Sequence, residues 1–183
     1  MDDLVAVLQI EEADFAALRR HAAESYPEEC CGLLIGRRET DGVGPEPAPA
    51  CGGVWRVTRV VPAANRAENR KRSFEVDPAT HIALLRGLRE ASRTGATGPE
   101  ELAESLLGPY HSHPDASSRP STRDRAQAME VDAVWLILGS TESGVTAADA
   151  WRTIRQPDGT IDFTPMELSV LSAEAMATPD EMP

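Results

Sequence analysis

The spacing of apolar side chains predicts strands and helices in alternation over the first half of the chain. Leu4–Ile10 is an apolar run with β-branched residues, which predicts a strand. From Glu11 onward the apolar positions take helical spacing, with Leu18 and Ala22 four positions apart. Pro27 ends this predicted helix, because proline cannot continue one.

Further strands and helices follow in the same way. Cys31–Ile35 predicts a short buried strand closed by Gly36, and Asp77-Pro78 begins a predicted helix, since aspartate caps well and proline suits the first turn. The other predicted elements are strands at Val54–Pro62, paired with Ser73–Val76, and at Pro109–His113, Ala133–Leu138, Val145–Ile154 and Phe163–Leu171; helices at Glu100–Leu107 and Ser121–Glu130; and an exposed loop at Arg37–Gly53.

This order of elements predicts an α/β fold in one domain, a mixed sheet with helices packed on it. The length of 183 residues is about that of a single domain. We expect residues 1–171 to form the domain and residues 172–183 to form an acidic, flexible tail.

Composition narrows the class of protein. Hydrophobic residues make up 41% and charged residues 26%, which is typical of a soluble globular protein. No apolar run approaches the ~18 residues of a membrane span, and the start of the chain is acidic where a secretory signal is basic. Three cysteines, two of them adjacent, do not suggest a disulfide framework. We therefore expect a cytoplasmic protein with no membrane partner.

The charge balance argues against nucleic acid as a partner. Thirty acidic residues against 18 basic ones give a net charge of −12, whereas nucleic-acid binders usually carry a basic excess. One segment, Arg56–Arg72, is locally basic, with six Lys and Arg against a single Glu. This segment is either a solvated strand and loop or a docking surface for an acidic partner.

The candidate chemistry begins with two histidines, His111 and His113. Residues two apart on a strand point to the same face, so both imidazoles can share one metal ion. Pro114 follows at once and cannot continue a central strand, which places the pair at a strand end. His21 and His81 lie on predicted helices and are interpreted as ordinary helical residues.

Ser121 and Asp124 add a carboxylate close by. Their spacing alone is that of a helix capping box, an ordinary structural feature. Together with His111 and His113, however, Asp124 completes a set of three zinc ligands that leaves a position for water, as in catalytic zinc sites. The two interpretations are compatible, because a cap would hold the carboxylate still. The same donor set also suits non-haem iron.

These residues resemble the JAMM motif of the MPN+ metalloproteases. His111-Ser112-His113 is followed by seven residues, Ser121, two residues and Asp124, which matches the motif's spacing. A second part lies 82 residues upstream of His111, where Glu29-Cys30-Cys31-Gly32 resembles the family's Glu-x-Cys-Gly segment. The resemblance runs from about Leu8 to Leu171.

The resemblance implies an MPN (JAMM) fold, with a mixed curved sheet flanked by helices. It implies Zn²⁺ held by His111, His113 and Asp124. Glu29 would activate the zinc-bound water and later protonate the departing amine, and Ser121 would donate a hydrogen bond to the oxyanion. Cys31 is interpreted as a buried core residue. Cys30 would then face in another direction, and one such direction is toward the site.

Small free-standing bacterial members of the family resemble the Mec type. The expected function is therefore zinc-dependent hydrolysis of the peptide bond after the C-terminal Gly-Gly of a ubiquitin-like sulfur-carrier protein, releasing an amino acid such as cysteine. The alternative is an isopeptidase that removes a ubiquitin-like modifier from protein lysines. A non-catalytic MPN scaffold is disfavoured by the full ligand set, and a homodimer is compatible with the fold.

Overall fold

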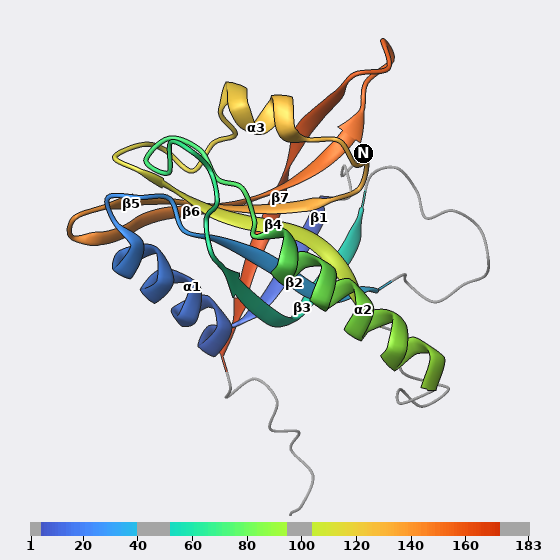
Figure 1. Ribbon diagram of the computed structural model, residues 1–183. Helices are drawn as coiled ribbons and strands as arrows, with labels where there is room; N and C mark the ends of the chain where they lie inside the picture. The colour runs from blue at the N-terminus through green and yellow to red at the C-terminus, as the bar shows by residue number, and fades with distance from the viewer. Residues whose placement is uncertain (1–4, 40–51, 95–103, 173–183) are drawn as a thin grey trace, which may run out of the picture.

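The structure is a computed structural model that describes residues 5–39, 52–94 and 104–172 (Figure 1). Within these ranges the elements are, in chain order, β1 (Ala6–Glu11), α1 (Glu12–Ser25), β2 (Cys31–Glu39), β3 (Gly53–Ala63), α2 (Pro78–Thr94), β4 (Ser105–Pro114), α3 (Thr122–Gln127), β5 (Val134–Thr141), β6 (Gly144–Arg155) and β7 (Ile161–Leu171). None of the helices in the described ranges is long and apolar enough to span a membrane.

The strands form one mixed sheet that curls until its two ends meet. Their order is β1-β3-β2-β4-β5-β6-β7, and parallel pairing of β1 with β7 closes the sheet into a barrel. The pairs β1–β3 and β4–β5 are also parallel, whereas the remaining neighbours are antiparallel. The predicted α/β class and mixed, curved sheet are thus confirmed.

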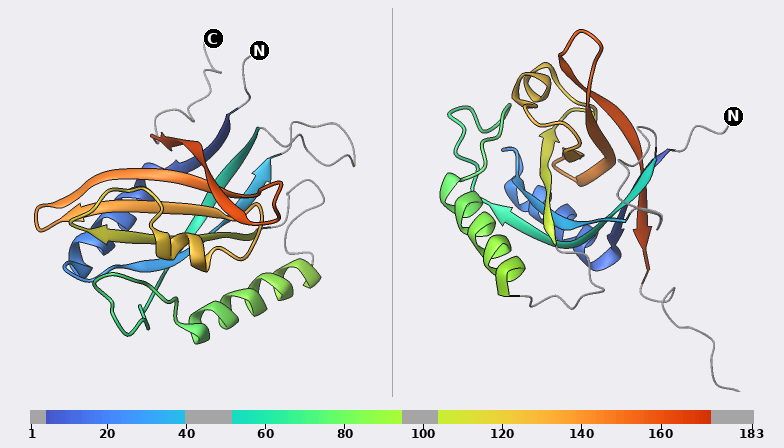
Figure 2. Two further views of the ribbon diagram at one scale, coloured as in Figure 1. Left: turned by 90° about the horizontal axis from the view of Figure 1, so that it is seen from above. Right: turned by 90° about the vertical axis from the view of Figure 1, so that its right-hand side faces the viewer.

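Two apolar clusters lie on opposite faces of the strands. In the larger one, Leu18 and Ala22 of α1 are fully buried in a cluster with side chains from all seven described strands. In the smaller one, the members are Cys31, Phe74, Ala128 and Trp135. Along β5, Val134, Leu136 and Leu138 join the larger cluster and Trp135 joins the smaller one, as the two-residue period of a strand requires. Accordingly, α1 and α3 lie on opposite sides of the sheet (Figures 1 and 2).

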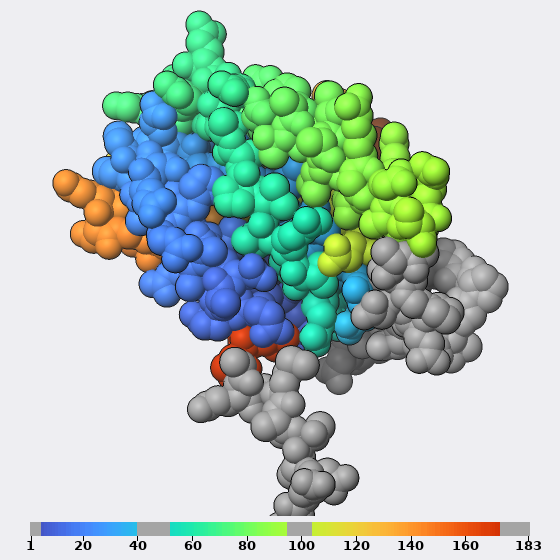
Figure 3. Space-filling view, turned by 60° about the horizontal axis from the view of Figure 1, so that its bottom comes forward, coloured from blue at the N-terminus to red at the C-terminus, as the bar shows by residue number. Residues whose placement is uncertain are grey.

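Helix α2 lies on the outside of the molecule. Figure 3 shows it beside β3, away from α1, and none of its residues is buried. The segment between β3 and α2, residues 64–77, makes one β-bridge, from Asn65 to Val76. The predicted pairing of Ser73–Val76 with Val54–Pro62 is therefore wrong. Strand β3 pairs with β1 and β2 instead, and Phe74 is drawn into the smaller apolar cluster.

Two further predictions need correction. Ser105–Leu107, predicted as part of a helix, belongs to β4, because it pairs with Ile35 and Gly36 of β2. Gly36 does not close its strand, since β2 continues to Glu39. A Cβ at Gly36 would lie 2.0 Å from the carbonyl oxygen of Arg56, so glycine serves there for close approach of two strands.

Other predicted boundaries fall partly outside the described residues. Most of the predicted loop 37–53, the start of the predicted helix at Glu100, and all of the predicted tail except Ser172 lie in ranges that the structure does not describe. Helix α3 is shorter than predicted, since it ends at Gln127 with Ala128 as its C-cap.

Candidate metal centre and active site

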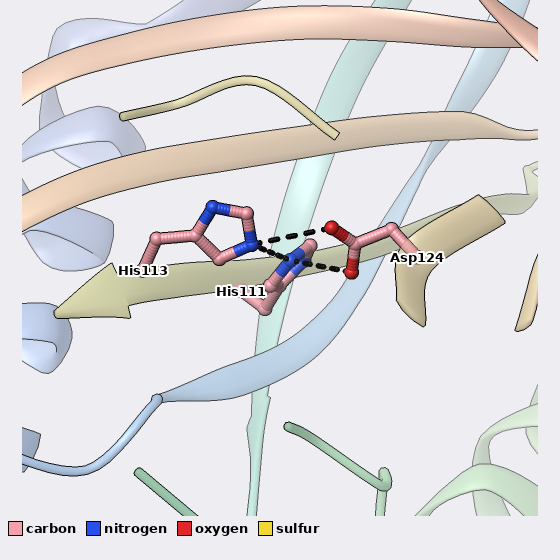
Figure 4. A group of neighbouring side chains, drawn as sticks. All are labelled: His111, His113 and Asp124. Atoms are coloured by element: carbon pink, nitrogen blue, oxygen red, sulfur yellow. Dashed lines mark hydrogen bonds and ion pairs between the residues drawn. The ribbon is translucent and has the colours of Figure 1, made fainter. Parts of the chain in front are cut away.

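Strand β4 places His111 and His113 side by side at its end. Both imidazoles leave the same face of the strand and point toward Asp124 of α3 (Figure 4). Their Nε2 atoms lie 2.9 Å apart, and the side chains are 0% and 8% exposed. Because side chains alternate along a strand, two histidines separated by one residue place their Nε2 atoms close together on the same face.

Asp124 enters the site from the first turn of α3. Ser121 is the N-cap, and a complete capping box joins the two residues. The Ser121 amide donates to Oδ2 of Asp124 at 2.6 Å, and the Asp124 amide donates to Oγ of Ser121 at 3.2 Å. The two carboxylate oxygens lie 3.1 Å from Nε2 of His111 and 3.2 Å from Nε2 of His113.

These three side chains fit a zinc ion. They form the one group of potential ligands found in the described residues, with ligand atoms within 4.8 Å of one another. Ligand atoms ~2.0–2.1 Å from a tetrahedral zinc ion lie about 3.3 Å from each other, close to the distances here. Nδ1 of His113 is 2.8 Å from the carbonyl oxygen of Ser117. As a donor to that carbonyl, Nδ1 carries the proton and leaves Nε2 free to bind a metal.

The surroundings of the histidines set their orientation and charge. The ring of Phe74 stacks on His111 with centroids 4.2 Å apart, and Trp135 meets His111 edge-on. Burial lowers the pKa of His111, despite its hydrogen bond with Asp124. A neutral imidazole is the form that a metal ion requires.

For Asp124, hydrogen bonding has a larger effect on the pKa than burial does. Burial opposes its charged form, but hydrogen bonds with His111 and His113 outweigh burial and hold the pKa of Asp124 far below its usual range. For His113, burial works against protonation, but the hydrogen bonds to Asp124 and the Ser117 carbonyl raise its pKa. Asp124 is therefore ionised at neutral pH, the form in which a carboxylate can bind a metal ion.

Glu29 lies at the junction between α1 and β2, directly before the buried strand. Its amide donates to the carbonyl oxygen of Arg70 at 2.7 Å, and its carbonyl accepts from Nδ2 of Asn65 at 3.0 Å. The residue is only 6% exposed. Burial raises its pKa from 4.5 to about 7, with His113 opposing and Asp124 adding to the rise. A carboxyl group with this pKa can exchange protons near neutral pH.

One cleft joins these residues. Glu29, His113 and Ser121 line a hollow of about 520 Å³, together with Lys71 and Arg72 on its rim. The Ser121 hydroxyl accepts the cap hydrogen bond and still has its own proton to donate. Ser121 is exposed, so that proton can reach a ligand in the cleft. The structure thus brings all five predicted site residues into one region.

The other cysteines and histidines considered in the sequence lie elsewhere or have structural roles. Cys31 is buried in the smaller apolar cluster, as predicted, but Cys30 faces the larger one and not the site. Burial raises the pKa of Cys30 to about 11 and that of Cys31 to about 12, so both stay protonated thiols. Nδ1 of His21 lies 2.9 Å from the Tyr110 hydroxyl, and His81 lines an apolar hollow that none of the three candidate ligands lines.

The basic residues of Arg56–Arg72 lie in two different settings in the structure. Several of its arginines form ion pairs on the surface, such as Arg66 with Asp77 and Arg70 with Glu28. Lys71 and Arg72 border the cleft instead. Exposed ion pairs contribute little to stability, so the paired part behaves as a solvated surface.

Some supporting residues gave no usable signal in the sequence. The Ser117 contact to His113 uses a backbone carbonyl, which any residue could supply. Tyr26 donates to the Asp115 carboxylate at 3.1 Å, joining the end of α1 to the end of β4, 89 residues later. Such a pairing depends on a long-range fold that no local spacing reveals.

Comparisons with known proteins agree with this geometry. A model of the family described as prokaryotic homologs of the JAB domain matches residues 11–154. The chain is 27% identical to a desampylase of Haloferax volcanii over 133 residues, which are 73% of this chain and 76% of that protein. It is 31% identical to a probable TtuB-protein conjugate cleaving protease of Thermus thermophilus over 122 residues, covering 67% of this chain and 64% of that protein.

A similar fold is found among solved structures. The solution structure of a Desulfitobacterium hafniense protein aligns with a TM-score of 0.61 and 23% identity, over 91% of this chain and 96% of that one. At this level of identity the likeness shows the fold alone.

Proposed function

Because the chain belongs to the family of prokaryotic homologs of the JAB domain, with JAMM-type peptidase activity, we propose that it is a zinc-dependent peptidase for a ubiquitin-like sulfur carrier. It would hydrolyse the peptide bond after the C-terminal Gly-Gly of the carrier and release an amino acid such as cysteine. The family predicted from the two sequence motifs is confirmed by the match over residues 11–154.

The observation that carries the proposal is the convergence of three buried ligand atoms beside a raised-pKa carboxyl group. Nε2 of His111, Nε2 of His113 and the Asp124 carboxylate would hold the zinc ion. When bound in such a site, zinc lowers the pKa of a coordinated water to about 7 and polarises a carbonyl group. The cleft beside the ligands would admit an extended peptide tail.

Glu29 is the proposed general base and acid. Its carboxylate would accept a proton from the attacking water and then donate that proton to the nitrogen of the leaving amine. Burial raises the pKa of this carboxyl group above its ordinary value, which favours uptake of a proton by the carboxylate. Products are then a carrier with a free C-terminal carboxylate and a free amine.

Ser121 is the proposed oxyanion donor. Its hydroxyl proton is available to the cleft, because the cap uses the oxygen only as an acceptor. A hydroxyl held by a helix cap needs little reorganisation when charge develops on the carbonyl oxygen, which is the condition for electrostatic stabilisation.

A ubiquitin-like protein is the proposed partner. One relative is named a desampylase and the other a protein that cleaves TtuB-protein conjugates, so both names concern removal of a protein modifier. These names also favour the alternative, an isopeptidase that removes such a modifier from lysine side chains. The complete ligand set argues against a non-catalytic scaffold. We place the activity in the cytoplasm, on the support of the free thiols Cys30 and Cys31.

The experiment is an intact-mass assay with two substrates. The zinc-loaded protein is mixed with a bacterial sulfur carrier that bears one cysteine after Gly-Gly, and separately with the same carrier joined through Gly-Gly to a lysine side chain. The proposal predicts loss of the single cysteine at a rate well above cleavage of the lysine adduct. Preferential cleavage of the lysine adduct would establish the isopeptidase instead.

A further inference from the structure

Ser112, the residue between the two histidines, faces away from the metal ligands and toward the Glu29 segment. It is fully buried. Its Oγ accepts a hydrogen bond from the amide of Cys30 at 2.9 Å, and its own amide donates to the carbonyl oxygen of Cys30 at 3.1 Å. The central residue of the motif therefore contacts the residue directly after the proposed base.

The side-chain bond stands in place of a strand-ladder bond. Strands β2 and β4 are paired up to Cys31 and His111, so Cys30 and Ser112 are the next residues along both strands. In a regular antiparallel ladder the Cys30 amide would donate to the backbone carbonyl of Ser112. Here it donates to the hydroxyl, and the chain turns away from the sheet at Glu29.

This bond fixes one end of a single peptide group. The peptide between Glu29 and Cys30 has its carbonyl held by Asn65 at 3.0 Å and its N–H held by Ser112 at 2.9 Å. With both ends held, the plane of this peptide cannot rotate, and the direction of the Glu29 side chain follows from it. Ser112 lies between His111 and His113. The same bond therefore fixes the position of Glu29 relative to the strand that carries the proposed metal ligands.

We propose that Ser112 is a positioning residue, which sets the place of the Glu29 carboxylate relative to the metal through its bond to the Cys30 amide. The inference rests on the proposed function, in which Glu29 moves the proton. Ser112 itself touches neither metal nor substrate. Its hydroxyl is required because alanine offers the Cys30 amide no acceptor, so the peptide would rotate toward the backbone carbonyl or toward water.

The first test is the kinetics of Ser112→Ala against Ser112→Thr. Alanine removes the acceptor, and we expect kcat to fall about 10- to 100-fold, since a displacement of about 1 Å in a catalytic group has such an effect. KM and zinc stoichiometry should stay at wild-type values, because the ligands and cleft walls are unchanged. Threonine keeps the hydroxyl and should restore most of kcat.

The second test does not depend on activity. In protein loaded with Co²⁺ in place of Zn²⁺, the paramagnetic shift of the Glu29 amide in NMR spectra reports its position relative to the metal. We expect this shift to change in Ser112→Ala and to return in Ser112→Thr, with faster hydrogen exchange of the Cys30 amide in the alanine variant. Should alanine fail to fold, Ser112→Cys, similar in size and a weak acceptor, takes its place.

Thr153→Val is the matched control. Thr153 is also fully buried, and its hydroxyl accepts from the amide of Ala133 at 2.9 Å and donates to the carbonyl oxygen of Glu130 at 2.7 Å, so valine removes the same kind of bond, and a second one, away from Glu29. It should lower stability but leave kcat and the Glu29 shift unchanged. An unchanged Glu29 shift in Ser112→Ala would overturn the proposal whether or not the protein cleaves a carrier. A shift that responds, in a protein that cleaves neither substrate, would count against the proposed function alone.

Discussion

Ser121 and Asp124 cap the same helix turn reciprocally, and the cap uses a carboxylate oxygen that also faces the histidines. Oδ2 of Asp124 lies 2.6 Å from the Ser121 amide and 3.2 Å from Nε2 of His113. The structural and the chemical interpretation of the Ser-x-x-Asp spacing therefore describe one arrangement. A helix cap orients the proposed third ligand before any metal binds.

Replacing Asp124 by asparagine should separate these two roles. The amide oxygen of asparagine can still accept the hydrogen bond from the Ser121 amide, so the zinc-free variant should keep the capping box and helix α3. The neutral amide is a poor zinc ligand, so zinc affinity should fall by at least about 100-fold. Titration with a competing chelator measures the affinity, and a wild-type value would remove Asp124 from the ligand set.

The two roles of Ser121, as helix N-cap and as proposed oxyanion donor, can be separated in the same way with two variants. Ser121→Gly lacks the hydroxyl but costs only about a few tenths of a kcal/mol at an N-cap, whereas Ser121→Ala lacks the hydroxyl and costs about 1 kcal/mol in stability. Both should lower kcat by roughly 10²- to 10³-fold, the usual effect of removing one oxyanion donor. If the glycine variant kept wild-type kcat, the Ser121 hydroxyl would not be the oxyanion donor.

Zinc should stabilise the folded protein through the His111 site. At a free zinc concentration about 1,000 times Kd, binding adds about 4 kcal/mol to the free energy of unfolding. Thermal unfolding with and without zinc gives this difference for the wild type and for His111→Ala. The variant should lose most of the zinc-dependent increment, whatever its own stability without metal. An increment of wild-type size would show that zinc binds elsewhere.

Without metal, Glu29 should destabilise the fold at alkaline pH. Its folded pKa of about 7 lies above the ordinary 4.5, so the folded state holds the proton more tightly than the unfolded chain does. The contribution of Glu29 to stability is therefore full below pH 4.5 and is lost as pH rises through 7. Zinc-free Glu29→Gln should be more stable than wild type at pH ~8, by about 3 kcal/mol, and similar to it at pH ~4.5. Urea unfolding at both pH values decides this, and an advantage equal at both would contradict the raised pKa.

The site was more readily predicted from the sequence than the sheet that carries it. The shared face of His111 and His113 follows from the two-residue period of a strand, and the capping box of Ser121 and Asp124 follows from its spacing, because both rules are local. The strand at Ser105–Leu107 was missed, since its conformation depends on pairing with Ile35, about 70 residues earlier. Closure of the barrel pairs Val7 with Glu167, and no local pattern encodes such a contact.

The residues that support the candidate site through packing and hydrogen bonds were harder to predict from the sequence. Phe74 was predicted on a strand, but the fold uses it to stack on His111. Asn65 showed no pattern in the sequence, although its side chain makes four hydrogen bonds in the structure, to Glu29, Ala67, Ser73 and Glu75. Such roles arise from tertiary contacts, to which hydrophobic periodicity is blind.

The most direct test of the central claim compares zinc content and turnover in Glu29→Gln. Metal binding is assigned to His111, His113 and Asp124 and proton transfer to Glu29, so the two properties should separate. We expect one zinc ion per chain in wild type and variant alike. With the carrier bearing one cysteine after Gly-Gly, intact mass should show loss of that residue for wild type and none for the variant. Near-wild-type turnover by the variant would contradict this assignment, because the proton would then be moved by another group.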